Sequence, residues 1–249
     1  MTIMLSDDSG GAQKIVIFGA NGQTGRLATK RALDSGNRVV AVTRRPRDFP
    51  LVGPGLTVAQ ADVREASAVE PLVAGADAVV STLGVTFTRE PVDTYSVGTA
   101  NIVAAMAAAR KQRLVVVSST AAYPTRRHRA PFALRLVEPI ITHTIGKTVY
   151  DDIRRMETIV RDSGLDWTIV RPSGLFDLPA PTDYLRGEVD PVGGFTARID
   201  LADYLVSLAA DNTTTARRTV IVSTIENTPS LWQMIRREAG SGSSAAAAS

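Results

Sequence analysis

A glycine-rich segment near the start of the chain has the residue types and the spacing that can hold phosphate against backbone amides. It stands between an apolar run at 14–18 and a segment of helical periodicity at 25–35. Glycines permit a tight turn, the approach of a diphosphate and close packing of the helix on the strand, while the helix N-terminus offers free N–H groups and a positive dipole end. We predict a dinucleotide-binding loop here; the alternative is a strand-to-helix turn that binds nothing. The loop comprises Gly19, Ala20, Asn21, Gly22, Gln23, Thr24 and Gly25.

The end of the second apolar run, 38–43, discriminates between the two nicotinamide dinucleotides. An NAD-binding site places an acidic residue here for the ribose 2′-hydroxyl. This chain has Arg44 and Arg45 instead, and a guanidinium can pair with a 2′-phosphate through two hydrogen bonds. The residues therefore predict NADP(H) as the cofactor, unless both arginines are merely solvated.

Two more candidate contacts follow the third and fourth apolar runs. Asp62 and Val63 come just after the third run, where the carboxylate could accept a hydrogen bond from the adenine amino group. Leu83 and Gly84 end the fourth run, where a glycine permits close approach of the cofactor. Asp and Gly are also common turn formers, but this architecture binds ligands at the carboxyl ends of its strands.

Strand-like and helix-like segments alternate along most of the chain, which implies parallel strands joined by right-handed crossovers. We predict an α/β fold: a Rossmann-like, doubly wound parallel sheet in three αβα layers, forming a single domain over 13–239 with a small C-terminal substrate-side region. The ends, 1–12 and 240–249, are expected to be flexible. Strands are predicted at 14–18, 38–43, 56–61, 77–83, 113–118, 166–171 and 219–223, and helices at 25–35, 66–74, 92–110, 149–163, 201–209 and 230–238.

Composition and charge exclude several kinds of chemistry and partner. The 249 residues include no cysteine and two histidines, so we expect no metal site. The net charge is only +3, and the basic residues around His128 form no broad face, so we expect no nucleic-acid partner. The strongly apolar run at 102–109 is too short to span a bilayer, and the start lacks the pattern of a signal peptide. We expect a cytoplasmic protein without a membrane partner, as a monomer or weak homodimer.

These motifs and others within 14–225 resemble the atypical short-chain dehydrogenase/reductases. The resemblance is to the NADPH-dependent flavin reductase/biliverdin-IXβ reductase group and its NmrA-like relatives. The other motifs are DAVVSTLG at 77–84, ANIVAAM at 100–106, VVVSST at 115–120, DDIRRM at 151–156, RDSGL at 161–165 and VRP at 170–172. The resemblance implies a shallow substrate site over the nicotinamide. It implies NADPH contacts from the glycine loop, Arg44, Asp62, Val63, Leu83, Gly84 and Ser118, with Pro172 and Ser173 on the carboxamide side of the nicotinamide.

The catalytic residues are less clearly marked. The sequence contains no Tyr-x-x-x-Lys motif, which in the usual short-chain dehydrogenases protonates a ketone oxygen. His143 and Lys147 have the same spacing and form a candidate pair, with a loop or surface pair as the alternative. For Tyr150 we predict a packing role. Ser119 and Thr120 are candidates to hydrogen-bond the acceptor, or else only to orient the cofactor.

The resemblance favours an NADPH-dependent oxidoreductase that transfers hydride to a flavin, a quinone-like compound, or an aromatic or polyketide carbonyl compound. Such conjugated acceptors can take their proton from solvent, so positioning over the nicotinamide is the main catalytic contribution. The segments 126–130 and 176–194 are expected to shape the acceptor pocket. Two alternatives are a non-catalytic, NmrA-like sensor of NADP(H) and a non-redox epimerase.

Overall fold

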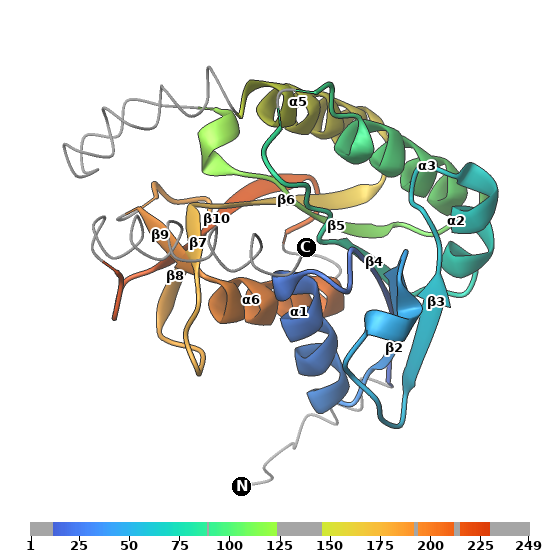
Figure 1. Ribbon diagram of the computed structural model, residues 1–249, viewed down its shortest axis with the longest axis horizontal. Helices are drawn as coiled ribbons and strands as arrows, with labels where there is room; N and C mark the ends of the chain where they lie inside the picture. The colour runs from blue at the N-terminus through green and yellow to red at the C-terminus, as the bar shows by residue number, and fades with distance from the viewer. Residues whose placement is uncertain (1–11, 89, 124–145, 192–193, 212–214, 230–249) are drawn as a thin grey trace, which may run out of the picture.

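The computed structural model describes residues 12–88, 90–123, 146–191, 194–211 and 215–229, which are built around an eight-stranded sheet (Figure 1). Its order is β3-β2-β1-β4-β5-β6-β10-β8. All neighbours pair in parallel except the edge strand β8, which is antiparallel to β10. The strands are β1 (Lys14–Phe18), β2 (Arg38–Thr43), β3 (Leu56–Gln60), β4 (Ala78–Ser81), β5 (Arg113–Val117), β6 (Asp166–Pro172), β8 (Tyr184–Gly187) and β10 (Arg218–Thr224).

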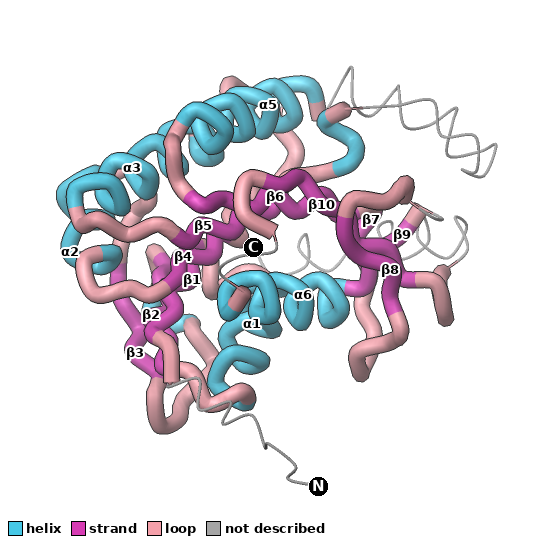
Figure 2. Tube along the Cα trace, turned by 180° about the vertical axis from the view of Figure 1, so that it is seen from behind, coloured by secondary structure: helices cyan, strands magenta, loops and turns pink. Residues whose placement is uncertain are grey.

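Helices cover both faces of the sheet and give the three predicted layers. Helices α2, α3 and α5 lie on one face and α1 and α6 on the other, as both views show (Figures 1 and 2). The helices are α1 (Gln23–Asp34), α2 (Ala66–Val73), α3 (Thr94–Ala108), α5 (Lys147–Asp162) and α6 (Arg198–Ala210), with short 3₁₀ turns η1 (Pro46–Asp48) and η2 (Thr120–Ala122).

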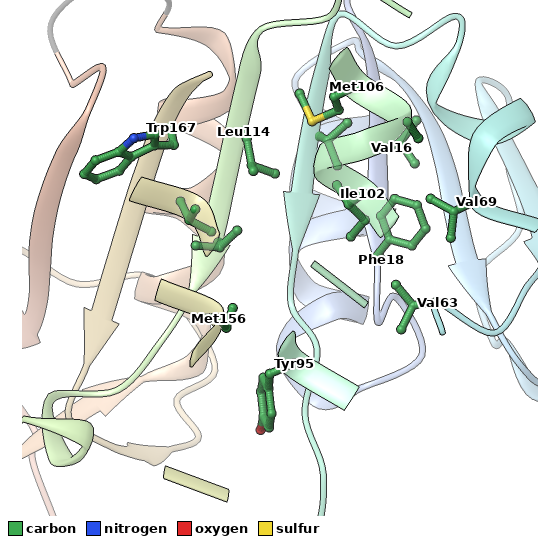
Figure 3. Packing of buried hydrophobic residues seen from close by; sticks show 14 of the residues in the cluster. Val16, Phe18, Val63, Val69, Tyr95, Ile102, Met106, Leu114, Met156 and Trp167 are labelled. Atoms are coloured by element: carbon green, nitrogen blue, oxygen red, sulfur yellow. The ribbon is translucent and has the colours of Figure 1, made fainter. Parts of the chain in front are cut away.

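The central strand β1 shows why the apolar runs are nearly continuous. Val16 and Phe18 belong to the core on the α3 side, which also contains Ile102 (Figure 3), whereas Ile15 and Ile17 belong to the core beneath α1 and α6. All four strand side chains are at most 1% exposed. A strand buried on both faces needs apolar residues at every position, which is the pattern of parallel sheets in α/β proteins.

The direction in which strands are added reverses at the middle of the sheet. The chain builds β2 and β3 on one side of β1 and then crosses to β4 on the other side. Doubly wound sheets bind ligands at this reversal, outside the carboxyl ends of the strands. The glycine loop directly follows β1, so it lies at the position where a ligand is expected.

The predicted fold class is confirmed, and the predicted strands and helices within the described ranges are found within a few residues. The structure adds elements that were not predicted: β8, and a separate two-stranded parallel sheet of β7 (Gly174–Phe176) and β9 (Phe195–Ala197). Strand β8 is the edge of the main sheet, whereas β7 and β9 form a small C-terminal sheet beside it (Figure 1). The predicted helix at 230–238 and both chain ends lie outside the described residues. Among the described helices, none has the length and hydropathy needed to cross a membrane.

Candidate functional site

Two glycines of the predicted loop are required by the backbone around them. Gly19 has a φ of +75°, and a Cβ there would lie 2.6 Å from the carbonyl oxygen of Thr82, just after β4. A Cβ on Gly25, in the first turn of α1, would collide with the Gly19 carbonyl oxygen. Gly22 has an extended backbone and is exposed. The turn is thus closed by its outer glycines, and the middle glycine leaves the surface of the loop open.

The N-terminus of α1 presents amide groups that the helix itself does not use. The Arg26 N–H donates to the Gly22 carbonyl at 2.9 Å, and the Gly22 N–H donates back to the Gly19 carbonyl at 3.0 Å. The N–H groups of 23–25 therefore precede the helical hydrogen-bond ladder. The first turn contains no acidic residue, so the positive end of the helix dipole can attract an anion.

Arg26 adds a positive charge that the sequence reasoning did not include. Its guanidinium donates two hydrogen bonds to the Asn21 side-chain oxygen, at 3.0 Å from Nε and 2.7 Å from Nη2. This places the cation on the loop itself, and Arg26 remains exposed to solvent. Its position directly after the third glycine is a signal that could have been read from the sequence.

The structure separates the roles of the two arginines predicted to bind a 2′-phosphate. Both are exposed, but Arg45 forms an ion pair with Asp48 at 3.5 Å. Arg44 instead lies close enough to Asp62 to lower the pKa of that carboxyl group. The residues that follow β2 and β3 therefore lie close together, and Arg44 is the better candidate for the phosphate.

Asp62 is held mainly by its neighbour Arg64. Its carboxylate accepts hydrogen bonds from Arg64 Nε at 3.2 Å, Nη2 at 2.9 Å and the backbone N–H at 3.0 Å. The side-chain bonds from Arg64, then its backbone bond and the charge of Arg44, lower the pKa of Asp62 to about 2. The predicted contact with adenine stays a prediction, and it requires Asp62 to share its oxygens with Arg64.

Val63, Leu83 and Gly84 differ in what they can offer to a ligand. Val63 is buried against α3, where a Cβ on Gly98 would lie 2.6 Å from its Cγ1 and 3.3 Å from Leu83 Cδ1. Asn101 also donates to the Val63 carbonyl at 3.0 Å. Gly84 is exposed with open space where a side chain would stand. Of the three, Gly84 has the surroundings that the predicted close approach of the cofactor requires.

Ser118, at the carboxyl end of β5, uses its hydroxyl to bind a buried glutamate. Its Oγ donates to Glu157 Oε1 at 2.5 Å, and Glu157 also accepts two bonds from Arg171 and one from Arg161. Burial raises the pKa of Glu157, but the bonds from Arg171 and Ser118 outweigh it, and the net shift is downward. Ser118 would therefore contact a cofactor through its backbone rather than through its hydroxyl. Sequence reasoning missed Glu157.

The residues predicted beside the nicotinamide are held in different ways. Ser119 Oγ accepts a hydrogen bond from the Ala121 N–H at 3.1 Å and caps η2, and Thr120 is buried. Pro172 ends β6. The next residue, Ser173, is also buried and anchored by its N–H on Thr196 Oγ1 at 3.0 Å, yet its own Oγ has no hydrogen-bond partner among the described residues. A buried, unpaired hydroxyl is costly, and a ligand amide would satisfy it.

The candidate catalytic pair is not assembled by the described structure. His143 lies outside the described residues, as does the segment 126–130. Lys147, the first residue of α5, is exposed and pairs with Asp151 at 2.9 Å. Tyr150 is buried, and its ring lies 5.9 Å from that of Phe87, as the predicted packing role requires. The catalytic role of His143 and Lys147 stays a prediction.

The second aspartate of the DDIRRM motif has a structural task. Asp152 is fully buried and accepts hydrogen bonds from the N–H groups of Tyr95, at 2.8 Å, and Ser96, at 3.3 Å. These belong to the first turn of α3, so Asp152 on α5 satisfies the N-terminus of another helix. Arg155 donates to the same carboxylate at 3.1 Å. The motif thus fastens α3 to α5.

The chemistry of this region fits a dinucleotide. Open amides and Arg26 stand where a diphosphate would lie, Arg44 stands beyond β2, and an unpaired buried hydroxyl stands at the end of β6. Within the described ranges, no three His, Cys, Asp or Glu side chains gather as a metal site would require.

Several known proteins are similar to this chain in sequence or in fold. The (4-alkanoyl-5-oxo-2,5-dihydrofuran-3-yl)methyl phosphate reductase of Streptomyces griseus is 33% identical over 158 residues, 64% of this chain and 46% of that protein. The chain spans less than half the length of the first curated relatives it matches. A short-chain dehydrogenase/reductase of Veillonella parvula, solved in complex with NADP, is 20% identical with a TM-score of 0.70, covering 89% of this chain and 100% of that one. ChuY, an anaerobillin reductase of Escherichia coli O157:H7, is 21% identical with a TM-score of 0.66, covering 87% and 100%.

These solved structures share the fold of this chain. The family model described as NAD(P)H-binding matches residues 19–212, from the first glycine of the loop to just beyond α6. The match includes every described helix, whereas β1 and β10 lie outside it. The chain belongs to the NAD(P)H-binding family.

Proposed function

We propose that the protein is an NADPH-dependent reductase of a small-molecule acceptor. The observation that carries the proposal is the open glycine loop at the reversal of the strand order, followed after β2 by Arg44 in place of an acidic residue. The names of two similar proteins, a furanone phosphate reductase and an anaerobillin reductase, support reduction as the reaction. The NADP in the V. parvula structure supports the choice of cofactor.

The residues of this chain would bind each part of the cofactor separately. The amides of 23–25 and the Arg26 guanidinium would hold the diphosphate, and Arg44 would hold the 2′-phosphate. Ser173 would bond the carboxamide through its unpaired hydroxyl. Bound there, NADPH would supply a hydride to the acceptor, and water would supply the proton that completes the reduction.

The preferred acceptors are a flavin, a quinone-like compound, or an aromatic or polyketide carbonyl compound. The sequence has no Tyr-x-x-x-Lys motif to protonate an isolated ketone, and a conjugated acceptor spreads the incoming charge without a positioned acid. Ser119 and Thr120 would orient the acceptor or the cofactor at the end of β5. The contribution of the protein is then mainly positional.

NADPH binding and turnover should be measured together. We expect NADPH to bind more tightly than NADH, and NADPH to be oxidised in the presence of at least one flavin, quinone or aromatic ketone. Tight binding of NADPH with no oxidation by any acceptor would replace the proposal with the redox-sensor alternative. Chemical conversion without net loss of NADPH would favour an epimerase, and absence of NADPH binding would refute the site itself.

A further inference from the structure

Phe87 is an aromatic side chain left half exposed at the ligand-binding edge of the sheet. It lies in the segment 82–88, which follows β4 and leads toward α5 (Figure 1). Its side chain is 49% exposed. A single exposed apolar residue needs no explanation by itself. The position of Phe87 is notable because β4 borders the reversal of the strand order, where the cofactor is proposed to bind.

The backbone on both sides of Phe87 is fixed. The Val85 N–H donates to the hydroxyl oxygen of Tyr95 at 3.3 Å, and Thr148 Oγ1 donates to the Thr88 carbonyl at 2.9 Å. Tyr95 is itself anchored, since its own N–H donates to the buried Asp152. These bonds connect the segment to α3 and to the start of α5, so the exposed ring is held in place from two helices.

A second ring stands behind the first. The centroids of the Phe87 and Tyr150 rings lie 5.9 Å apart, with an interplanar angle of 50°. This centroid distance is within the range of favourable aromatic pairs. Tyr150 is a residue of α5 and is only 8% exposed, so a buried side chain supports the Phe87 ring. One face of the pair is therefore buried, and the exposed part of Phe87 remains available to a ligand.

We propose that Phe87, supported by Tyr150, is the surface on which a planar conjugated acceptor stacks, and that it determines the specificity of the enzyme for such acceptors. This inference rests on the proposed reductase function and names the residues that select its substrate. A flat ring system gains offset or edge-to-face contacts with an aromatic side chain that an aliphatic carbonyl compound does not gain. The proposal therefore predicts a preference among acceptors and leaves cofactor binding unaffected.

The test compares Phe87→Leu, Phe87→Tyr and the control Val97→Ala, which alters another partly exposed apolar residue, on the surface of α3. Acceptors are FMN, a simple naphthoquinone and an aliphatic ketone, each with NADPH. We expect Phe87→Leu to raise KM for FMN and the quinone about tenfold and to change kcat less. The aliphatic ketone should be a poor acceptor for the wild type, and Phe87→Leu should leave its slow turnover unchanged. Phe87→Tyr keeps an aromatic ring and should keep the wild-type KM values. Val97→Ala should also show the wild-type KM for each acceptor.

A binding measurement separates this inference from the function on which it rests. FMN binding to the protein loaded with NADP⁺ can be measured without turnover, through the quenching of flavin fluorescence. Phe87→Leu should weaken FMN binding about tenfold as well. If the wild type reduces FMN or the quinone while Phe87→Leu retains wild-type KM and FMN affinity, the stacking role is wrong and the reductase function stands. If the wild type binds NADPH and FMN but reduces none of the acceptors, the reductase function is wrong. Weaker FMN binding by Phe87→Leu would then still identify Phe87 as part of the site. Absence of FMN binding and of turnover in the wild type would overturn both.

Discussion

Replacing Arg44 with alanine should reduce the preference for NADPH over NADH. Arg44, Arg64 and Asp62 meet at the ends of β2 and β3, where Arg64 is bonded to the ionised Asp62. The pair of Arg64 and Asp62 is close to neutral, so Arg44 is the member of this group whose charge remains to be balanced by a 2′-phosphate. A hydrogen bond to a charged group contributes about 1.5–3 kcal/mol, and exposure of the guanidinium to solvent places Arg44 at the lower end.

The expected loss is therefore about 1.5 kcal/mol, or about tenfold in the Kd of NADPH. NADH lacks the phosphate, and its Kd should change less than twofold. Arg45→Ala is the matched control, because the Arg45 guanidinium pairs with Asp48 at 3.5 Å. The assay is titration of each variant with both cofactors at fixed ionic strength. The preference for NADPH is the Kd of NADH divided by the Kd of NADPH. The reasoning is refuted if Arg44→Ala keeps the wild-type preference, or if Arg45→Ala lowers the preference equally.

Three further substitutions test the loop, the buried network and the charged cluster. Gly25→Ala puts a methyl group against the Gly19 carbonyl oxygen. Calorimetric titration should show NADPH affinity lowered more than tenfold, and urea unfolding should show the free energy of unfolding lowered by about 2 kcal/mol. A variant with wild-type affinity would contradict the phosphate-binding role of the glycine loop. Glu157→Gln leaves two arginines without their buried carboxylate and should cost about 3 kcal/mol in urea unfolding, whereas the exposed Glu70→Gln should cost little; equal stabilities would show that the network is not stabilising. Because the folded pKa of Asp62 is lowered to about 2 from its ordinary 3.8, its ionic bonds stabilise the fold above pH 3.8 and this contribution fades toward pH 2. The Tm difference between the wild type and Asp62→Asn should therefore shrink over that range of acid pH, and a difference that grew with acid would contradict the assignment.

The parts of the structure that could be predicted from the sequence are those encoded by neighbouring residues. Six of the seven parallel strands of the main sheet are largely buried and follow from apolar runs, because a strand buried on both faces has no polar alternation to obscure it. Strand β3, at the edge of the sheet, is partly or fully exposed along its length. The glycine loop and Arg44 are likewise local, since each is defined by its distance from the end of one strand. Local sequence therefore predicted the proposed cofactor side of the site.

The parts that could not be predicted depend on contacts between distant residues. Strand β9 is short, and its place depends on side chains elsewhere: the Ala197 N–H donates to Thr224 Oγ1 at 2.8 Å, and Thr196 Oγ1 donates to the Val222 carbonyl at 2.7 Å. The bond from Ser118 to Glu157 joins residues 39 positions apart. Neither has a periodic signal in the sequence, so no motif could indicate it.

Helix α5 links these non-local contacts into one system. It carries Thr148, which holds the segment with Phe87, Asp152, which satisfies the N-terminus of α3, and Glu157, which binds the end of β5 through Ser118. These contacts reach the segments after β4 and β5, whereas the glycine loop is built from β1 and α1. Changes within α5 can therefore alter the proposed acceptor side while the glycine loop, proposed to bind phosphate, keeps its shape. In this chain, local motifs determine the proposed cofactor side, and the packing of a single helix determines the proposed acceptor side.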